Sequence, residues 1–378
     1  MSFLTGIKVL ELSDGLVDFG GRILAELGAE VLSLTHAEQP QRNAARTLAW
    51  HHGKERFQVN DQDLESILGL LDEADIVLDG RRTNATFLPD DLTAERPQLI
   101  QVVVYPYQPK GPYASRKATD LTLMAMSGLM TLTGDPDRPP LRFPGEQAYA
   151  LTGIQAATAA LMALQARHRT ERGQRVLLSA FQSATLANYR SAIQYEWTGR
   201  IARRSGNLLV RGKSGVRQVW PCADGFVTWS MIDNPNMMRS LVRTLQEQGC
   251  AGELADIEWE NILVADTDQP IIDRWQQIFG EFFLRHTKAQ LGDWSLKGGW
   301  GLSVINTLKE VKAHPHLQHR SLFVPIEDEG QGRSTPLPGP LFKAQPEKAE
   351  NKGPRRILSP LRLLASSANA REVSHDEG

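Results

Sequence analysis

The sequence contains only two cysteines, Cys222 and Cys250, among 378 residues. Two such distant thiols are too few for a disulfide framework or for a zinc site built on cysteine. No apolar run approaches the ~20 residues that a membrane-spanning helix needs. The start of the chain shows no basic stretch followed by an apolar core and a small-residue cleavage site, so no secretory signal is evident. These absences favour a soluble protein in a reducing compartment, and we expect the cytoplasm.

The chain also lacks a surplus of positive charge. It contains 42 lysines and arginines and 44 aspartates and glutamates, which gives a formal net charge of -2. A general nucleic-acid binder needs basic residues in excess to displace counterions from the phosphates. We therefore expect neither a nucleic acid nor a membrane as partner. The length allows one large domain or two ordinary ones.

The first third of the sequence alternates between apolar strands and helical segments. Strand-like runs at Ile7–Leu12 and Glu30–Leu34 flank a helix-like segment at Gly20–Leu27, which is the length of a parallel crossover unit. A helix around Asp63–Ala74 precedes further apolar runs at Ile76–Asp79 and Leu99–Val104. Because these runs are almost continuously apolar, they predict buried parallel strands in an α/β domain.

Two longer helices follow, and the pattern changes after about residue 200. Thr119 can cap the first helix, and the second, alanine-rich helix covers roughly Tyr149–Arg167. Strand-like runs at Val216–Trp220 and Phe226–Trp229 then flank a predicted turn, and two further helices are expected, at Pro235–Gln248 and Ile271–Arg285. We therefore predict a large domain over residues 1–200, joined by part of 326–378, and a small α+β domain over 201–325. Residues 345–378 form a polar tail of little periodicity.

The usual motifs for cofactors and hydrolases are missing. The loop after the first strand reads SDGLVDFGG, which is not the G-x-G-x-x-G of dinucleotide-binding proteins. The chain has no G-x-S-x-G elbow. His314, His316 and His319 stand close in sequence without a matching set of carboxylates, so we expect a loop or helix-capping role and no metal site. Pattern and spacing alone thus predict a two-part α/β protein without assigning its chemistry.

Several segments, in order, resemble the class III CoA-transferases, the family of formyl-CoA transferase and carnitine CoA-transferase. The first crossover unit ends in an L-G-A-E-V run at Leu27–Val31, and HHGKERFQVN stands where the family has N-R-G-K-R-S-x-x-L-D. DLTLMAMSGLM resembles D-L-x-x-Q-A-x-S-G-L-M, and YALTG followed by RTERGQRV resembles the D-Y-L-T-G helix and its R-x-x-T-G-R-G-Q-x-V continuation. The likeness covers about residues 5 to 325.

The resemblance implies a Rossmann-like large domain with a parallel sheet, a smaller domain, and two chains interlocked as a dimer. It also implies a CoA thioester as substrate or ligand, with no permanently bound cofactor. In such enzymes an aspartate attacks the thioester carbonyl and forms a mixed anhydride, so an ionised carboxylate is required as nucleophile.

The nucleophile's position departs from the family pattern. Aligning Thr152-Gly153 with the family helix places Tyr149 where the family has aspartate. A phenol with a pKa near ~10 is protonated at neutral pH, so it cannot act as the ionised nucleophile. Glu146, three residues earlier, is the carboxylate that could substitute if its loop is shifted.

The resemblance also indicates where CoA would bind, since its phosphates call for charge-assisted bonds from arginine and lysine. Some of these positions keep the family's residue type and others do not, which indicates a CoA pocket whose residues differ from the family pattern. The expected contacts are Gly15, Leu16, His36, Val59, Asn60, Gly80, Arg81, Arg82, Lys117 and Asp120.

Two hypotheses follow for the function. In the first, the chain is a CoA-transferase acting on an organic-acid CoA thioester, through Glu146 or as half of a shared site. In the second, it is a non-catalytic subunit paired with a family paralogue that retains the aspartate. The sequence leaves open whether the partner is a second copy or that paralogue.

Overall fold

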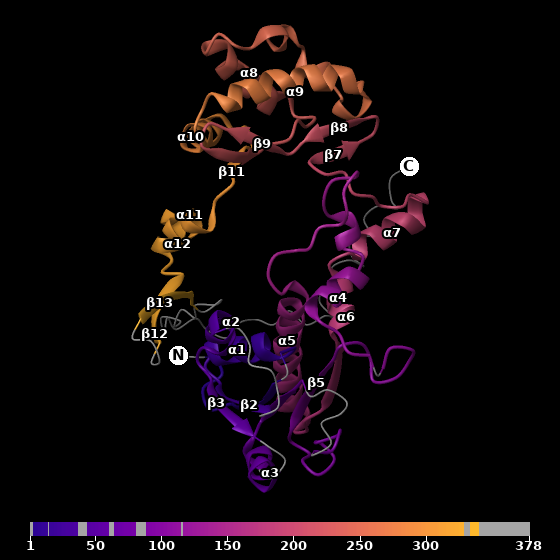
Figure 1. The fold of residues 1–378 in the computed structure, drawn as a ribbon, viewed down its shortest axis with the longest axis vertical. Coiled ribbons are helices and arrows are strands. Elements are labelled where there is room, and N and C mark those ends of the chain that lie inside the picture. Colours follow the sequence, from indigo (N-terminus) through magenta and orange to yellow (C-terminus); the bar gives the residue numbers. More distant parts are fainter. Residues whose placement is uncertain are drawn as a thin grey trace, which may run out of the picture. The chain divides into compact units, whose positions relative to one another are not determined.

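A six-stranded parallel sheet organises the amino-terminal half of the computed structural model, which describes residues 3–13, 15–36, 44–59, 64–80, 88–114, 116–328 and 333–339. Its spatial order is β3-β2-β1-β4-β5-β6, so successive strands are added on one side of β1 up to β3 and on its other side from β4 onward. This confirms the predicted parallel α/β fold. Figure 1 labels β2, β3 and β5 of this sheet. The strands are β1 (Lys8–Ser13), β2 (Glu30–His36), β3 (Glu55–Val59), β4 (Ile76–Asp79), β5 (Ile100–Tyr105) and β6 (Arg175–Ser179).

Helices connect and cover these strands. They are α1 (Asp18–Glu26), α2 (Ala44–His51), α3 (Leu64–Glu73), α4 (Asp120–Met126), α5 (Gln147–Thr170), α6 (Ala180–Leu186) and α7 (Tyr189–Thr198), with a short 3-10 helix, η2 (Met130–Leu132). Thr119 caps α4 as predicted, because its hydroxyl accepts the backbone N–H of Thr122 at 3.3 Å. No helix in the described ranges is both long enough and apolar enough to cross a bilayer.

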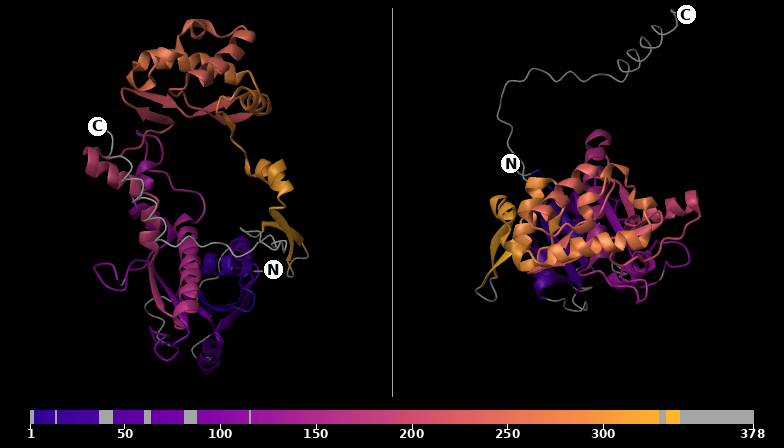
Figure 2. Two further views of the ribbon diagram at one scale, coloured as in Figure 1. Left: turned by 180° about the vertical axis from the view of Figure 1, so that it is seen from behind. Right: turned by 90° about the horizontal axis from the view of Figure 1, so that it is seen from above.

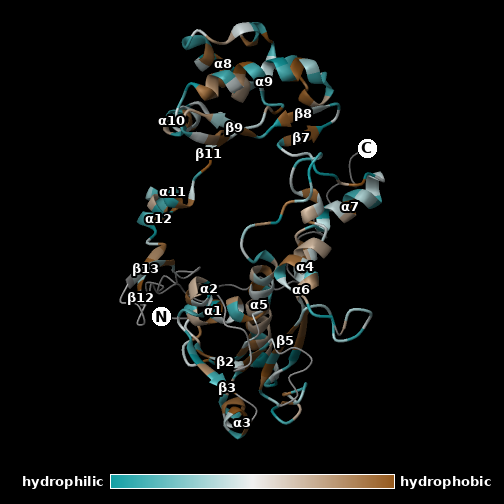
Figure 3. Ribbon diagram, viewed as in Figure 1, coloured by the Kyte–Doolittle hydropathy of each residue, from teal (hydrophilic) through white to brown (hydrophobic). Residues whose placement is uncertain are grey.

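The central strands of the sheet are buried on both faces, which explains their nearly continuous apolar sequences, whereas the edge strand β3 is mostly exposed. Along β1, Val9 faces the core formed with α1 and α5, whereas Leu10 and Leu12 face a second core. That second core includes Ile67 and Leu71 of α3. All six residues of β5 are buried, and Figure 3 colours this strand as hydrophobic. Alternate residues of β1 therefore serve different cores, as expected for a strand covered on both sides.

Helices α1 and α5 cross in close backbone contact on one face of the sheet, and Figure 2 shows them from behind. The crossing lies at Gly20 and Gly153. A Cβ atom on Gly153 would lie 2.8 Å from the backbone nitrogen of Gly20, and one on Gly20 would lie 2.9 Å from the carbonyl oxygen of Gly153. Only glycine fits at this contact, because the obstructing atoms belong to backbone. The crossing therefore fixes the position of α5 beside the carboxyl end of β1.

The second half of the chain has its own aromatic core. It contains two small sheets, a β7-β8 pair and a three-stranded β11-β10-β9 sheet. Trp220, Trp229, Phe279, Phe283 and Trp300 are buried together there. The elements are β7 (Leu208–Arg211), β8 (Ser214–Arg217), β9 (Val219–Cys222), β10 (Gly225–Thr228), α8 (Pro235–Glu247), η3 (Gly252–Asp256), η4 (Trp259–Asn261), η5 (Val264–Asp266), α9 (Gln269–Leu284), α10 (Lys288–Gly298) and β11 (Ser303–Val304).

One strand expectation in this region was wrong. The segment Val216–Trp220 is not a single strand: its first residues belong to β8, which pairs with β7, and its last belong to β9, which pairs with β10. The two strands are separated by Gln218, whose backbone N–H donates to the carbonyl oxygen of Asn207 at 3.1 Å. The predicted hairpin itself is confirmed, as β9 and β10 pair antiparallel around Ala223-Asp224.

The histidine-rich segment near the carboxyl end forms short helices. These are α11 (Leu308–Ala313) and α12 (Pro315–His319), followed by the antiparallel pair β12 (Phe323–Asp328) and β13 (Arg333–Pro338). His314 caps α12 by accepting the backbone N–H of His316 at 3.3 Å. This confirms the expected capping role. The predicted domain boundaries remain a prediction, and the polar tail lies outside the described residues.

We predict that Gly153→Ala destabilises the protein by about 1–3 kcal/mol, because the methyl group would push α5 away from α1. Chemical denaturation of the full chain measures this difference. The matched control is Gly69→Ala in the middle of α3, where an added Cβ meets nothing within 4 Å. Because alanine favours a helix more than glycine does, the unfolding free energy of that control should rise by roughly 0.5–1 kcal/mol. Equal effects of the two substitutions would contradict the close-crossing argument.

Candidate functional site

Several predicted site residues meet at the carboxyl edge of the parallel sheet. Gly15 and Leu16 follow β1, His36 and Val59 are paired at the ends of β2 and β3, and Gly80 follows β4. The backbone N–H of Gly80 donates to the carbonyl oxygen of Leu12 at 3.0 Å, which joins the ends of two neighbouring strands. Ligands of open α/β sheets bind at this edge, near the point where strand order reverses.

Other expected contacts are less defined. Lys117 is exposed in the segment before α4. Asn60, Arg81 and Arg82 lie outside the described residues, as does the side chain of His36. The contact of all these residues with CoA stays a prediction.

Tyr149 lies in the first turn of α5, where it is only 5% exposed. Its backbone N–H donates to Oδ1 of Asp120 at 3.1 Å, and Ala148 donates a second backbone hydrogen bond to this carboxyl group. The helix's own N-cap residue, Glu146, makes no side-chain cap bond. Asp120 therefore caps α5 from the neighbouring helix, at the end where a helix favours negative charge.

Burial raises the pKa of Asp120, and the two backbone N–H groups oppose that rise. The sequence placed Asp120 among the CoA contacts, and the structure gives it this capping role as well. Since Asp120 and Tyr149 are both buried, the first turn of α5 is anchored in the protein and is not an open loop.

Glu146 is held in an ion pair at the start of α5. Its Oε2 lies 2.5 Å from Nε of Arg46, and Nη1 of the same guanidinium lies 2.8 Å from Oδ2 of Asp18. Arg46 also donates to the carbonyl oxygen of Gly15 at 3.3 Å and stacks over the ring of Trp50 at 4.0 Å. Burial acts against the charge of Arg46, but the carboxylates of Asp18 and Glu146 outweigh it and raise the pKa of Arg46.

A second set of buried charges, Glu11 and Lys54, lies on the other side of Asp18 from Arg46 along this chain of contacts. Nζ of Lys54 donates to both carboxylate oxygens of Glu11, at 2.8 and 2.7 Å, and both side chains are fully buried. Lys54 also donates to the carbonyl oxygen of Asp18 at 2.6 Å, and the hydroxyl of Ser33 donates to Glu11 at 2.7 Å. Burial raises the pKa of Glu11, with Lys54 acting in the opposite direction.

His51 joins the two sets of charges. Its Nε2 lies 3.3 Å from Oδ2 of Asp18, and its Nδ1 lies 3.8 Å from Glu11. Although burial acts in the opposite direction, His51, Lys54 and Arg46 hold the pKa of Asp18 well below its usual range. We call these six residues the buried charge cluster: Glu11, Asp18, Arg46, His51, Lys54 and Glu146.

Sequence reasoning found only Glu146 of this cluster. A usable signal was present for Glu11, because it is a charged residue between the apolar Leu10 and Leu12 of a buried strand, and a buried carboxylate requires a partner. Nothing local identifies that partner, since Lys54 is 43 residues away in sequence.

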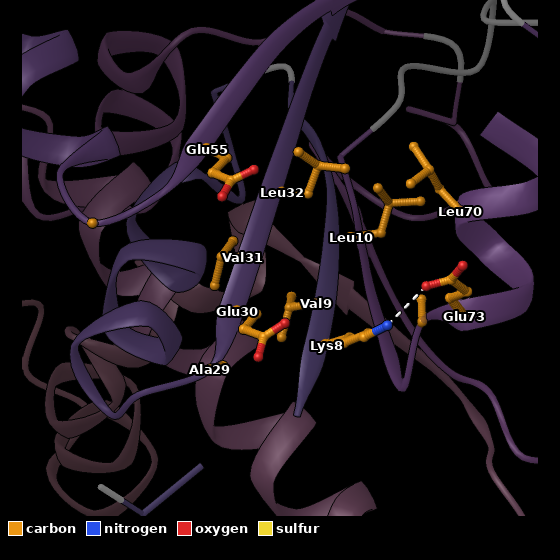
Figure 4. A pocket seen from close by; sticks show the side chains of 12 residues that line it. Lys8, Val9, Leu10, Ala29, Glu30, Val31, Leu32, Glu55, Leu70 and Glu73 are labelled. Atoms are coloured by element: carbon orange, nitrogen blue, oxygen red, sulfur yellow. Dashed lines mark hydrogen bonds and ion pairs between the residues drawn. The ribbon is translucent and has the colours of Figure 1, made fainter. Parts of the chain in front are cut away.

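A separate pocket of about 450 Å³ lies at the opposite edge of the sheet, at the amino ends of β1, β2 and β3 (Figure 4). Lys8, Glu30, Glu55 and Glu73 line it together with apolar residues of the sheet and α3, and Lys8 pairs with Glu73 at 2.7 Å. It contains none of the predicted site residues. Among the residues that the structure describes, no group of three or more His, Cys, Asp or Glu side chains could hold a metal ion.

The sequence profile described as CoA-transferase family III matches residues 4–355. The chain belongs to this family. The resemblance inferred from the first crossover unit, the D-L-T-L-M-A-M segment and the helix that begins at Tyr149 is thereby confirmed.

Curated relatives and a solved structure cover most of the family III chain. The chain is 24% identical, over 89% of its length and 87% of the relative's, to the succinyl-CoA:(R)-benzylsuccinate CoA-transferase subunit BbsE of Thauera aromatica. It is 28% identical to the succinyl-CoA–D-citramalate CoA-transferase of Chloroflexus aurantiacus, over 87% and 85% of the two lengths. A CaiB/BaiF family protein from Brucella suis has the same fold, with a TM-score of 0.77 and 25% identity over 91% of this chain and 93% of that one.

We predict that Lys54→Met destabilises the protein by about 3–5 kcal/mol, because it leaves the buried carboxylate of Glu11 without its countercharge. The unfolding free energy at neutral pH measures the loss. Lys8→Met is the matched control, since it breaks an exposed lysine–glutamate pair at the same distance of 2.7 Å, and exposed pairs contribute little. A similar loss in both variants would contradict the role assigned to burial.

Proposed function

We propose that this chain is the non-catalytic, CoA-thioester-binding subunit of a heteromeric CoA-transferase. The observation that carries the proposal is Tyr149, buried in the first turn of α5, at the position where the family resemblance places the nucleophilic aspartate.

The reaction of the family requires a carboxylate at the position of Tyr149. A carboxylate oxygen attacks the thioester carbonyl carbon, the carbon–sulfur bond breaks, CoA leaves as the thiolate, and a mixed anhydride remains on the protein. A phenol is protonated at neutral pH, and its acyl product would be an ester instead of an anhydride. An ester is a poorer acyl donor, so the cycle would stop there.

The two curated relatives support both the subunit role and a substrate class. One is named as a subunit of its transferase, and both names include succinyl-CoA. We therefore propose a CoA thioester of a dicarboxylic acid, with succinyl-CoA as the first to test. Its CoA moiety would lie along the carboxyl edge of the sheet, at Gly15, Leu16, Val59 and Gly80, with the predicted basic residues supplying charge to the phosphates.

The surface of α7 supports a partner chain. Tyr189, Ile193 and Trp197 are exposed and recur every four residues, which places them on one face of the helix. No residue of α7 is buried within the chain. A row of large apolar side chains exposed to water usually marks a protein–protein contact. We propose that the partner is a family member whose corresponding helix retains the aspartate.

Catalysis by this chain through Glu146 is the second candidate. Glu146 is the N-cap residue of α5 and precedes Tyr149 by three residues, and its side chain remains 30% exposed. Its ion pair with Arg46 counts against this role, because a carboxylate neutralised by a guanidinium is a weaker nucleophile than a free one.

We expect the purified chain to bind succinyl-CoA without forming an acyl adduct. Intact mass spectrometry with and without hydroxylamine, which cleaves an acyl anhydride to a hydroxamate and a carboxylate, tests this directly. Isothermal titration calorimetry measures the binding. Co-purification with a paralogue that keeps the aspartate should yield transferase activity, with the adduct on the paralogue. A hydroxylamine-sensitive adduct on the isolated chain would rule out the non-catalytic role.

Glu146→Gln separates the two candidates, because it removes the carboxylate while keeping its size. If this chain is non-catalytic, the co-purified pair should still place the acyl group on the paralogue after this substitution. If Glu146 is the nucleophile, the substitution should abolish an adduct that the unaltered chain forms alone. Peptide mapping of the adduct after mild digestion locates the acylated residue in either case.

A further inference from the structure

Helix α2 contacts the rest of the protein through charged and aromatic side chains. Of its eight residues only His51 is buried. Its contacts with the rest of the protein come from two charged side chains, Arg46 and His51, and from Trp50. The ring of Trp50 lies 5.5 Å from that of Phe19. Lys54, shortly after the helix, adds a third charged contact. Charged side chains of α2 and of the segment after it thus accompany its aromatic packing, beside the candidate site.

Arg46 connects two segments that are distant from it and from each other in sequence, the β1–α1 connection and the start of α5. Nη2 donates to the carbonyl oxygen of Gly15 after β1, Nη1 to the carboxylate of Asp18 at the start of α1, and Nε to Glu146 at the start of α5. Gly15 has a φ of 111°, a conformation that favours glycine, and this conformation accompanies its carbonyl contact with Arg46. One guanidinium thus fixes the loop after β1 to the amino end of α5.

The contacts use separate nitrogens, so the geometry of the side chain matters as well as its charge. Asp18 is only 1% exposed and Arg46 only 12% exposed, and the ring of Trp50 covers the guanidinium. A lysine could supply the charge but not three directed donors in one plane.

We propose that Arg46 is a positioning residue of the CoA-thioester site, acting through Glu146 and Gly15 to set the separation between the loop after β1 and the first turn of α5. The inference rests on the proposed function, because it concerns the site at which the thioester binds. Glu146 is then a structural partner of Arg46, which accounts for a carboxylate beside Tyr149 that takes no part in acyl transfer.

A double-mutant cycle tests this proposal, with Arg46→Gln, Glu146→Gln and the double variant. Each single substitution should weaken binding of succinyl-CoA about tenfold, and the double variant should bind no more weakly than the worse of the two. Non-additivity is expected because both substitutions break the same contact. Arg46→Lys should recover only part of the affinity. Calorimetry measures Kd at a temperature where circular dichroism shows every variant folded.

The matched control is an arginine at the opposite end of α5 from Glu146. Arg167 near the end of α5 pairs with Asp75 at 2.8 Å and donates to the carbonyl oxygen of Gln98 at 3.0 Å. Arg167→Gln should lower the stability of the chain while leaving Kd for succinyl-CoA unchanged. A purely structural role for Arg46 predicts the same behaviour at both positions, so an equal shift in Kd would overturn the proposal.

The outcomes separate this proposal from the proposed function. Binding by the unaltered chain with additive losses in the cycle would overturn the role of Arg46 alone. No binding by the unaltered chain, alone or with its paralogue, would overturn the proposed function and this inference with it. If Arg46→Gln does not fold, the Kd of Glu146→Gln for succinyl-CoA tests the proposal by itself, because this variant keeps the pair of Arg46 and Asp18. Unchanged affinity in that variant would overturn the proposal.

Discussion

The close crossing of α1 and α5 constrains the rest of the large sheet-containing region. Two glycines allow the helix backbones to approach so closely that a Cβ atom on Gly153 would lie 2.8 Å from the backbone nitrogen of Gly20. This contact brings the first turn of α5 beside the loop after β1, at the edge where open α/β sheets bind their ligands. The position of Tyr149 in the candidate site depends on that juxtaposition.

The buried charge cluster packs against α1 beside this crossing. A Cβ atom on Gly21 would collide with the carboxylate of Glu11, so the glycine leaves room for the pair of Glu11 and Lys54. Buried ion pairs contribute little net stability when compared with apolar side chains of similar volume. Their presence beside a binding edge is therefore better explained by the geometry that they impose on α2, the β1 loop and α5.

Family membership favours a CoA-transferase, whereas the predicted departure at Tyr149 favours a chain without its own nucleophile. The fold is compatible with both. The sheet, its two cores and the aromatic second core are independent of the chemical nature of one side chain at the start of α5. A chain can therefore keep the scaffold while its nucleophile position holds a phenol. In an assembly of two related chains, one carboxylate would suffice for the chemistry, and the other chain would retain its binding surface.

Local patterns in the sequence predicted many of the strands and helices, the cap at Thr119 and the family, because each depends on residues close together along the chain. The family resemblance also predicts that Tyr149 stands at the nucleophile position. Only the tertiary structure decided that Asp120 caps α5, that Val216–Trp220 divides between two sheets, and that Arg46 holds Glu146 from 100 residues away. Such long-range pairings leave no periodic signal, since the free energy of a buried charge depends on partners that folding alone brings within hydrogen-bond distance.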